Sequence, residues 1–196
     1  MRKSGEERRQ EIVEAVVELA AEPGGRQITA QAIADRVGIA QPTVFRHFKN
    51  RERILEAVFE WIARQLLGVV SGVATSSGSA DERLRALLEK QLGFVSGHKG
   101  LPRLLFSERL HQENTRLKQS VRRIMQAYAV TVSEVIRDGV ESGAFRSDLD
   151  PDETARQIMA LVQGTIIRWS VSDFEFDLAG QVPALWRLLE PALRAE

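Results

Sequence analysis

Cysteine is absent from this chain of 196 residues, and its absence removes several chemistries at once. The chain cannot build a disulfide framework, bind zinc through thiolates or use a thiol as a catalytic nucleophile. A chain without disulfides also suits a reducing compartment, so we expect a cytoplasmic protein.

Long apolar runs are scarce as well. The first 16 residues contain basic side chains but lack the unbroken apolar core of a secretion signal. Elsewhere no apolar stretch reaches the about 20 residues that a membrane-spanning helix needs. The sequence therefore predicts a protein without a membrane partner.

Neither sign of charge is in excess, since 27 basic residues balance 27 acidic ones. Net charge thus gives no indication of a nucleic-acid partner, but the local distribution does. Residues 26–53 carry a net charge of +4, from Arg26, Arg36, Arg46, Lys49, Arg51 and Arg53 against Asp35 and Glu52. Such a segment can concentrate attraction for phosphate, although a solvated surface would show the same charges.

Apolar residues recur at helical spacing along most of the chain, and no pair of segments shows the alternation of a β-hairpin. The fold class is therefore predicted to be all-α, with about nine helices. The expected helices cover residues 6–21, 30–37, 41–48, 51–70, 80–96, a short segment after 102, 115–142, 151–170 and 178–193.

Residues with helix-capping chemistry mark several of these ends. Thr29, Asn50 and Asp150 each precede a helical pattern and can accept a hydrogen bond from an unpaired N–H of the first turn. Gly38 is expected to end the second helix in a left-handed conformation, and residues 23–25 (PGG) to end the first.

Residues 29–49 form the most informative stretch, because two short helices meet there at a glycine. A helix that enters the major groove of DNA must be short, firmly mounted and polar on one face, and the second helix fits this description. Gln41 can pair with adenine, and Arg46 can contact guanine or phosphate. His47 and Lys49 are placed for backbone phosphates. The alternative is a plain helical bundle.

This stretch resembles the helix-turn-helix of the TetR family of repressors. The similarity is strong over residues 8–66 and elsewhere is limited to the helical layout and the GAFRSDLDP junction at 143–151. Two residues depart from the family pattern: Ala40 replaces a serine that would cap the recognition helix, and Phe45 replaces a tyrosine whose hydroxyl would contact phosphate. The matching residues are Ile33-Ala34, Gly38-Ile39-Ala40, Thr43-Val44-Phe45-Arg46-His47-Phe48-Lys49 and Asn50-Arg51-Glu52.

The resemblance implies a division of labour along the chain. Residues 1–50 would form the helix-turn-helix DNA-binding domain, Arg51 to about Val70 a connecting helix that acts as a lever, and residues 71–196 an effector-binding and dimerisation domain. Residues 71–80 (SGVATSSGSA) have the composition of a flexible boundary. By analogy, DNA would be contacted by Thr29, Gln31, Gln41, Pro42, Thr43, Phe45, Arg46, His47 and Lys49.

The last two predicted helices carry more apolar residues than one buried stripe requires, which favours a homodimer, although a purely intramolecular core remains the alternative. The expected interface residues are Ile158, Val162, Ile166, Leu185 and Leu189. Aromatic and polar residues of the middle helices are candidates for a largely apolar effector pocket, or for ordinary core. They are Phe94, Phe106, Tyr128, Gln163 and Trp169, with His98, Arg109 and His111 nearby.

Two functions fit this pattern. The first is a regulator, most simply a repressor, that leaves a palindromic double-stranded DNA operator when a small-molecule effector binds. The second is an architectural protein that binds DNA without a ligand. The sequence offers no catalytic constellation, metal-ligand spacing or phosphate-binding glycine loop, so we expect no enzymatic activity, metal or cofactor.

Overall fold

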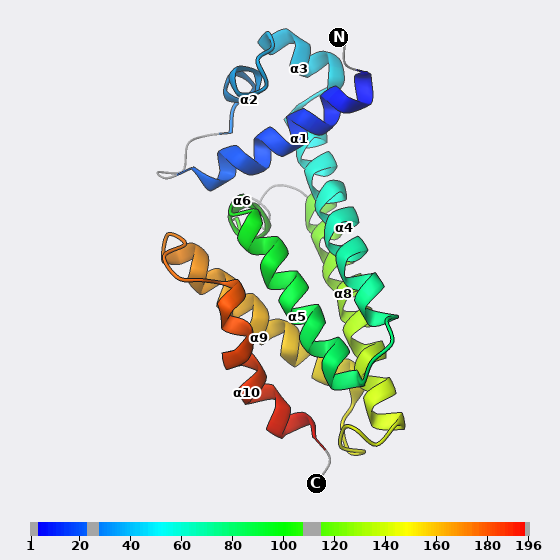
Figure 1. Ribbon diagram of the computed structural model, residues 1–196. Helices are drawn as coiled ribbons and strands as arrows, with labels where there is room; N and C mark the ends of the chain where they lie inside the picture. The colour runs from blue at the N-terminus through cyan, green and yellow to red at the C-terminus, as the bar shows by residue number, and fades with distance from the viewer. Residues whose placement is uncertain (1–3, 23–27, 108–114, 195–196) are drawn as a thin grey trace. The chain divides into compact units, whose positions relative to one another are not determined.

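The computed structural model describes residues 4–22, 28–107 and 115–194, and these residues form nine α-helices and no β-strand (Figure 1). The all-α prediction is therefore confirmed. The helices are α1 (Gly5–Ala21), α2 (Ala30–Val37), α3 (Gln41–His47), α4 (Arg51–Ala74), α5 (Ala80–Gly97), α6 (Gly100–Leu105), α8 (Thr115–Glu141), α9 (Pro151–Val171) and α10 (Val182–Leu193), with a 3-10 turn, η1 (Ala179–Gln181), before the last.

The predicted helix caps are present where their residues are described. Thr29 Oγ1 accepts from the Ala32 N–H at 3.1 Å, and Asn50 Oδ1 accepts from the Arg53 N–H at 3.0 Å. Gly38 has a left-handed φ of 72°. The first helix ends at Ala21 as expected, and residues 23–25 lie outside the described part of the chain.

α4 extends further than its sequence suggested. It was expected to end near Val70, but it continues to Ala74, so the first four residues of the supposed linker at 71–80 are helical. The hydroxyl of Thr75 donates to the Ser71 carbonyl at 3.2 Å, and Arg83 Nη1 donates to the Ala74 carbonyl at 2.8 Å. These bonds satisfy carbonyl groups of the last turn and so stabilise the longer helix. A composition rich in serine and glycine does not indicate such bonds.

α4 is also the one helix among the described residues that is long and apolar enough to cross a membrane by length and composition. The expectation that no stretch reaches that length is wrong for this helix. A helix that packs into a protein core meets the same criterion, so the finding is weak evidence for a membrane. Ile54, Val58 and Ile62 of α4 are buried.

The chain divides into two compact units. The N-terminal unit comprises residues 1–64 and 98–121, and the C-terminal unit comprises 65–97 and 122–196. Contacts thus group α6 with the helix-turn-helix, whereas the functional boundary predicted at 50 and 71 stays a prediction.

In the N-terminal unit, α6 packs closely against the end of α1. A Cβ atom on Gly100 would lie 1.9 Å from the Val17 carbonyl oxygen, so this approach requires glycine. Arg103 Nη1 donates to the carbonyls of Ala20, Ala21 and Glu22 at 3.4, 3.2 and 2.7 Å. The guanidinium therefore satisfies the carbonyl groups that a helix leaves unpaired at its C-terminus.

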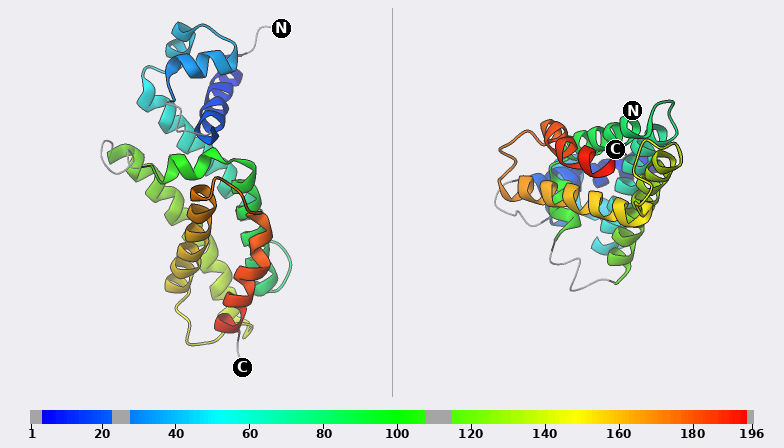
Figure 2. Two further views of the ribbon diagram at one scale, coloured as in Figure 1. Left: turned by 90° about the vertical axis from the view of Figure 1, so that its left-hand side faces the viewer. Right: turned by 90° about the horizontal axis from the view of Figure 1, so that it is seen from below.

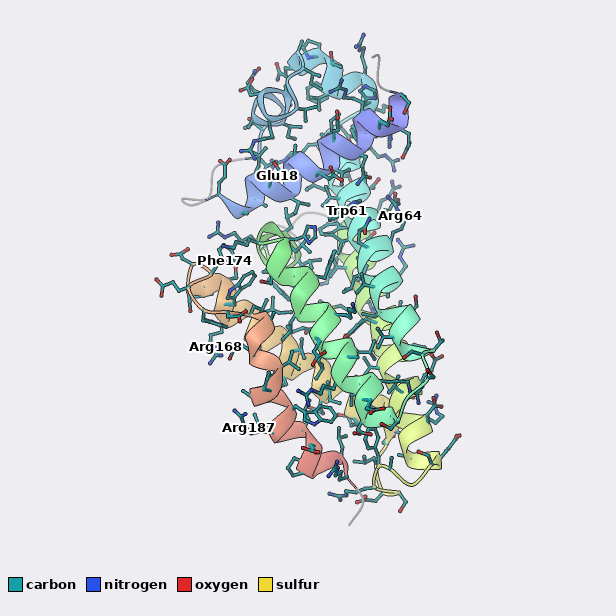
Figure 3. The ribbon with its side chains drawn as sticks, in the orientation of Figure 1. Glu18, Trp61, Arg64, Arg168, Phe174 and Arg187 are labelled. Atoms are coloured by element: carbon teal, nitrogen blue, oxygen red, sulfur yellow. The ribbon has the colours of Figure 1, made fainter. Side chains whose placement is uncertain are left out.

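A second contact ties the same segment to α4. Trp61, labelled in Figure 3, is buried, and its ring meets the His98 ring edge-on with centroids 5.4 Å apart. His98, which the sequence analysis grouped with the effector candidates, therefore belongs to the N-terminal unit and packs against α4.

The C-terminal unit packs α9 and α10 against α5, which two further views also show (Figure 2). Phe145 lies against Gly139 of α8, where a Cβ would come within 2.2 Å of the ring, and Gly143 takes a left-handed φ of 73° between them. Asp150 then caps α9 by accepting from the Glu153 N–H at 2.8 Å. The 143–151 junction is thus a close turn between two long helices.

Candidate nucleic-acid interface

α2 and α3 pack together through buried apolar side chains. Val44 and Phe48 are 0% and 1% exposed, and Ile33 and Ala34 of α2 are equally buried. Because residues three to four positions apart share a helix face, this leaves the opposite face of α3 free of packing. A short helix with one buried apolar face and one open face is the arrangement that groove binding requires.

The predicted DNA-contacting residues are mostly exposed. Seven are exposed and two, Thr43 and His47, are half-buried. The exposed seven are Thr29, Gln31, Gln41, Pro42, Phe45, Arg46 and Lys49. Six of the nine lie on α3, Thr29 and Gln31 lie at the start of α2, and Lys49 follows α3. Their contacts with DNA remain a prediction.

Two of these side chains are engaged within the free chain. Gln31 Nε2 donates to Asp35 Oδ1 at 2.6 Å, and Arg46 Nη2 approaches Thr43 Oγ1 at 3.4 Å. The first bond holds Gln31 beside an exposed carboxylate, which repels phosphate. Arg46 makes only a long contact, so its guanidinium is readily redirected.

α3 begins without a side-chain cap, as Ala40 predicts. The missing serine-type cap corresponds to about 0.5–2 kcal/mol of helix stability. Pro42 lies in the first turn, where its fixed φ favours the helix and its missing N–H costs nothing. The stability that α3 lacks without this cap must come from its packing and from contacts at its C-terminal end.

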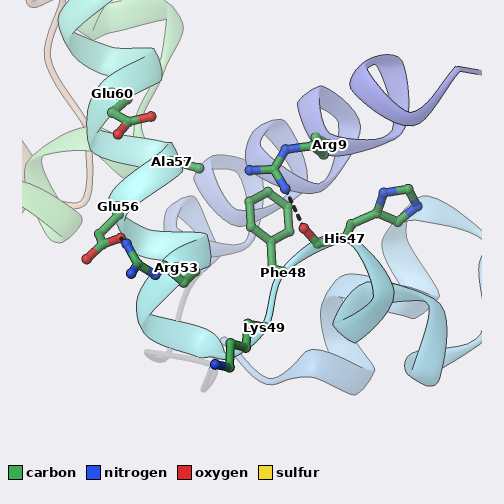
Figure 4. Close-up of a pocket in the computed structure, with 8 residues that line it drawn as sticks. All are labelled: Arg9, His47, Phe48, Lys49, Arg53, Glu56, Ala57 and Glu60. Atoms are coloured by element: carbon green, nitrogen blue, oxygen red, sulfur yellow. Dashed lines mark hydrogen bonds and ion pairs between the residues drawn. The ribbon is translucent and has the colours of Figure 1, made fainter.

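Arg9 holds that other end, and the sequence analysis missed it. Its guanidinium lies over the Phe48 ring, 4.2 Å from the centroid, and donates a hydrogen bond to the His47 carbonyl (Figure 4). A cation at a helix C-terminus is favoured by the helix dipole, and the ring adds a cation–π contact. Arg9 lies 38 residues from His47, so no local pattern indicates this contact.

A pocket of about 340 Å³ opens beside Arg9 (Figure 4). Its lining mixes charges of both signs, and Arg53 is paired with Glu56 at 2.6 Å. Lys49 lies exposed at the edge of this lining. The pocket is lined by Arg9, His47, Phe48, Lys49, Arg53, Glu56, Ala57 and Glu60.

The predicted effector residues do not form one group within either unit. Phe106 belongs to the N-terminal unit and the other four to the C-terminal unit. Tyr128 is buried, its hydroxyl donates to Gln91 Oε1 at 2.7 Å, and burial raises the pKa of that hydroxyl well above its usual range. Trp169 is buried and donates to the Phe176 carbonyl at 2.8 Å. Both polar atoms therefore have hydrogen-bond partners within the chain.

The remaining candidates are less constrained. Phe94 and Gln163 are half-buried, and Arg109 and His111 lie outside the described residues. Among the residues that the structure describes, no cluster of three or more His, Asp or Glu side chains could hold a metal ion.

The predicted dimer residues are mostly used by the chain's own core. Ile158, Val162, Ile166 and Leu185 are buried within the single chain, and Leu189 is half-buried. The exposed large apolar residues of α9 and α10 are instead Leu161, Ile167, Val171 and Leu188. The excess of apolar residues that the sequence predicted is therefore present on these helices. The exposed ones, however, are different residues from those predicted for the interface.

Comparison with known sequences identifies the arrangement. A profile described as "Bacterial regulatory proteins, tetR family" matches residues 12–58, and a TetR C-terminal profile described as "YsiA-like protein, C-terminal region" matches residues 63–192. The chain belongs to the TetR family. Together the two profiles span the helix-turn-helix and nearly all of the helices that follow it.

Individual TetR relatives match over almost the full length. A nucleoid occlusion factor, SlmA of Vibrio cholerae, is 25% identical over 188 residues, which cover 95% of this chain and 96% of the relative. A fatty acid metabolism regulator protein of Bacillus subtilis is 26% identical over 179 residues, which cover 91% and 92%.

Solved structures agree on the fold. The transcriptional regulator FadR of Bacillus subtilis, in complex with stearoyl-CoA, aligns with a TM-score of 0.79 at 27% identity, covering 92% of this chain and 96% of that one. A regulator from Saccharomonospora viridis in complex with choline gives a TM-score of 0.85 at 23% identity, covering 97% and 100%, and supports the fold alone. The prediction of a DNA-binding transcriptional regulator of the TetR family is confirmed.

Replacing Arg9 tests whether it holds the recognition helix. We expect Arg9→Met to lower the free energy of unfolding by about 1.5–3 kcal/mol, because the variant has neither the hydrogen bond from a charged group nor the cation–π interaction. Urea unfolding followed by circular dichroism measures the change.

Arg85→Met is the matched control, since Arg85 makes only an exposed pair with Glu89 at 3.3 Å. Its removal should change stability by at most about 0.5 kcal/mol. Equal effects of the two substitutions would show that the Arg9 contacts contribute nothing particular.

Proposed function

We propose that this TetR-family protein is a repressor that leaves a near-palindromic DNA operator when a small-molecule effector binds. The observation that carries the proposal is the open face of α3, which is mounted on buried Val44 and Phe48 and has basic side chains at its edge. The proposal includes no catalytic step, metal or cofactor, and it places the protein in the cytoplasm, where its DNA would be.

The roles proposed for the α3 residues follow from their chemistry. Gln41, exposed in the first turn, presents an amide that matches the N6 and N7 edge of adenine. Arg46 presents a fork that matches guanine or phosphate. Lys49 lies beyond the end of α3 and is placed for the phosphate backbone, as is His47. Thr29 and Gln31, at the start of α2, would lie near the phosphates beside the groove.

A homodimer is proposed because one seven-residue helix contacts few base pairs. Two recognition helices would meet half-sites whose centres are about 34–36 Å apart, one turn of B-DNA. The exposed apolar residues of α9 and α10 supply a surface for the contact, since Val171 and Leu188 are 79% and 67% exposed in the single chain. A contiguous exposed apolar patch marks an interaction surface, and the proposal is that these side chains form such a patch.

The effector proposed is a long-chain acyl thioester. FadR of Bacillus subtilis, a relative by sequence and by structure, was solved with stearoyl-CoA. The C-terminal unit here is rich in apolar helices, and Phe94 and Gln163 are its half-buried candidates for such a ligand. Tyr128 and Trp169 would shape the core around it, because their polar atoms are already bonded.

A second function is kept because of the other relatives. Several nucleoid occlusion factors match over about the whole chain at 24–27% identity. A protein that binds DNA without a metabolite would keep the same α3 surface, and only the response to a ligand distinguishes the two functions.

Substitutions of Gln41 and Lys49 should weaken DNA binding in different ways. Gln41→Ala should weaken binding to the preferred site by about 1–3 kcal/mol and relax the choice at one base pair per half-site. Lys49→Ala should weaken all sequences about equally and reduce the salt dependence of binding by about one counterion for each phosphate that is no longer neutralised. Titration against selected and scrambled duplexes at several salt concentrations measures both. A change of base preference in Lys49→Ala alone would contradict this placement of α3.

The apolar face of α9 and α10 should hold the dimer. Leu188→Glu should shift the protein from dimer toward monomer in sedimentation equilibrium at micromolar concentration, because the charge would have to be buried without a partner. Val130→Glu is the control, since Val130 is 57% exposed on α8 and lies outside this face. A wild-type chain that sediments near 21.9 kDa would refute the dimer itself.

Stearoyl-CoA should release the protein from its operator. A coupling of about 1–3 kcal/mol between the two sites lowers operator affinity about 5- to 150-fold, and fluorescence anisotropy of a labelled operator measures the shift. Free coenzyme A is the control for the headgroup. Sequence-specific binding that neither stearoyl-CoA nor free stearate alters would favour the ligand-independent function.

A further inference from the structure

Phe45 is an exposed aromatic residue on α3. Its side chain is 46% exposed, whereas Val44 before it is fully buried and Phe48 nearly so. Among the described residues of the N-terminal unit it is the one large hydrophobic side chain that is exposed. An isolated exposed aromatic is common on protein surfaces, so its position on α3 carries the argument.

That position follows from the helix geometry. With 100° between successive residues, Gln41 and Phe45 lie along one line of α3, and Pro42 and Arg46 form the adjacent line. All four are exposed, while Thr43 and His47 on the flanks are half-buried. Phe45 and Pro42 thus form an apolar centre with an amide on one side and a guanidinium on the other.

A phenyl ring at this place selects its partner by chemistry. It has no atom that can donate to or accept from a phosphate, so it cannot anchor the backbone. The apolar group that the major groove presents is the C5-methyl of thymine, which only A·T and T·A pairs carry. Packing that methyl against the ring removes both from water.

We propose that Phe45 recognises a thymine in each half-site through the C5-methyl group, and that it acts as a specificity-determining residue. This inference rests on the proposed function. The four-residue step from Gln41 to Phe45 rises about 6 Å along the helix, and base pairs are about 3.4 Å apart. The thymine therefore lies within about two base pairs of the adenine assigned to Gln41.

Uracil provides the test, because it lacks only the methyl group of thymine. A preferred site is first selected from random DNA with the full-length protein, and each of its thymines is then replaced by uracil, symmetrically in both half-sites. One replacement should weaken wild-type binding about fourfold per half-site, which is the effect of losing one buried methyl. The same replacement should leave the affinity of Phe45→Ala unchanged.

Three further variants define the result. Phe45→Tyr keeps the ring and should keep the uracil effect. Val130→Ala removes an exposed apolar side chain elsewhere and should behave as wild type. Phe45→Leu keeps an apolar group and should show a smaller uracil effect than the wild type. Thermal unfolding confirms that each variant is folded, which the exposure of Phe45 leads us to expect.

Several outcomes would overturn the inference. They are a selected half-site with no thymine on either strand, a wild-type protein indifferent to uracil everywhere, and a uracil effect that persists in Phe45→Ala, which would assign the methyl contact to Thr43 or Pro42. Absence of any sequence-specific binding would instead overturn the proposed function, and this inference with it.

Discussion

Seven residues are too few to form a stable helix in water, and this constraint governs the N-terminal unit. An isolated helix of two turns does not recover the cost of its nucleation, so tertiary contacts must hold α3. Val44 and Phe48 supply these contacts on one face, and the left-handed turn at Gly38 sets the direction from which α3 starts. The side chains on the opposite face of α3 are therefore exposed to solvent and are not needed to hold the helix in place.

The charges of the unit divide in the same way. Arg9 and Arg103 direct guanidinium groups inward, to carbonyls at the C-termini of α3 and α1. Arg46 and Lys49 are instead exposed to solvent. A chain of zero net charge can therefore hold cations both as caps of helix C-termini and as exposed side chains, even though acidic residues such as Asp35 and Glu56 lie in the same unit.

Local chemistry made most of the fold predictable. Thr29, Asn50 and Asp150 are recognisable caps because their partners lie three residues away. The exposed face of α3 followed from the same short-range periodicity. The contacts of Arg9 with α3 and of Gly100 with α1 could not be anticipated, since they join segments distant in sequence.

The C-terminal unit shows where periodicity stops being informative. An excess of apolar residues on α9 and α10 indicated two buried faces, but not which face the chain covers by itself. Ile166 is buried in the single chain and its neighbour Ile167 is exposed, a difference of one position that only the packing decides. The effector candidates met the same difficulty, because a core aromatic and a ligand-contacting aromatic have the same sequence pattern.

The three bonds from Arg103 to the end of α1 limit how the DNA-binding part of this protein can be transferred to a fusion or a chimera. The compact unit around the helix-turn-helix is assembled from two separate stretches of chain, and α6 comes from the second. A fusion that transplants only the contiguous N-terminal stretch leaves the last carbonyls of α1 without that guanidinium and exposes the surface that Gly100 covered. Recombination between family members is therefore expected to preserve function best when α1 and α6 are inherited from the same parent.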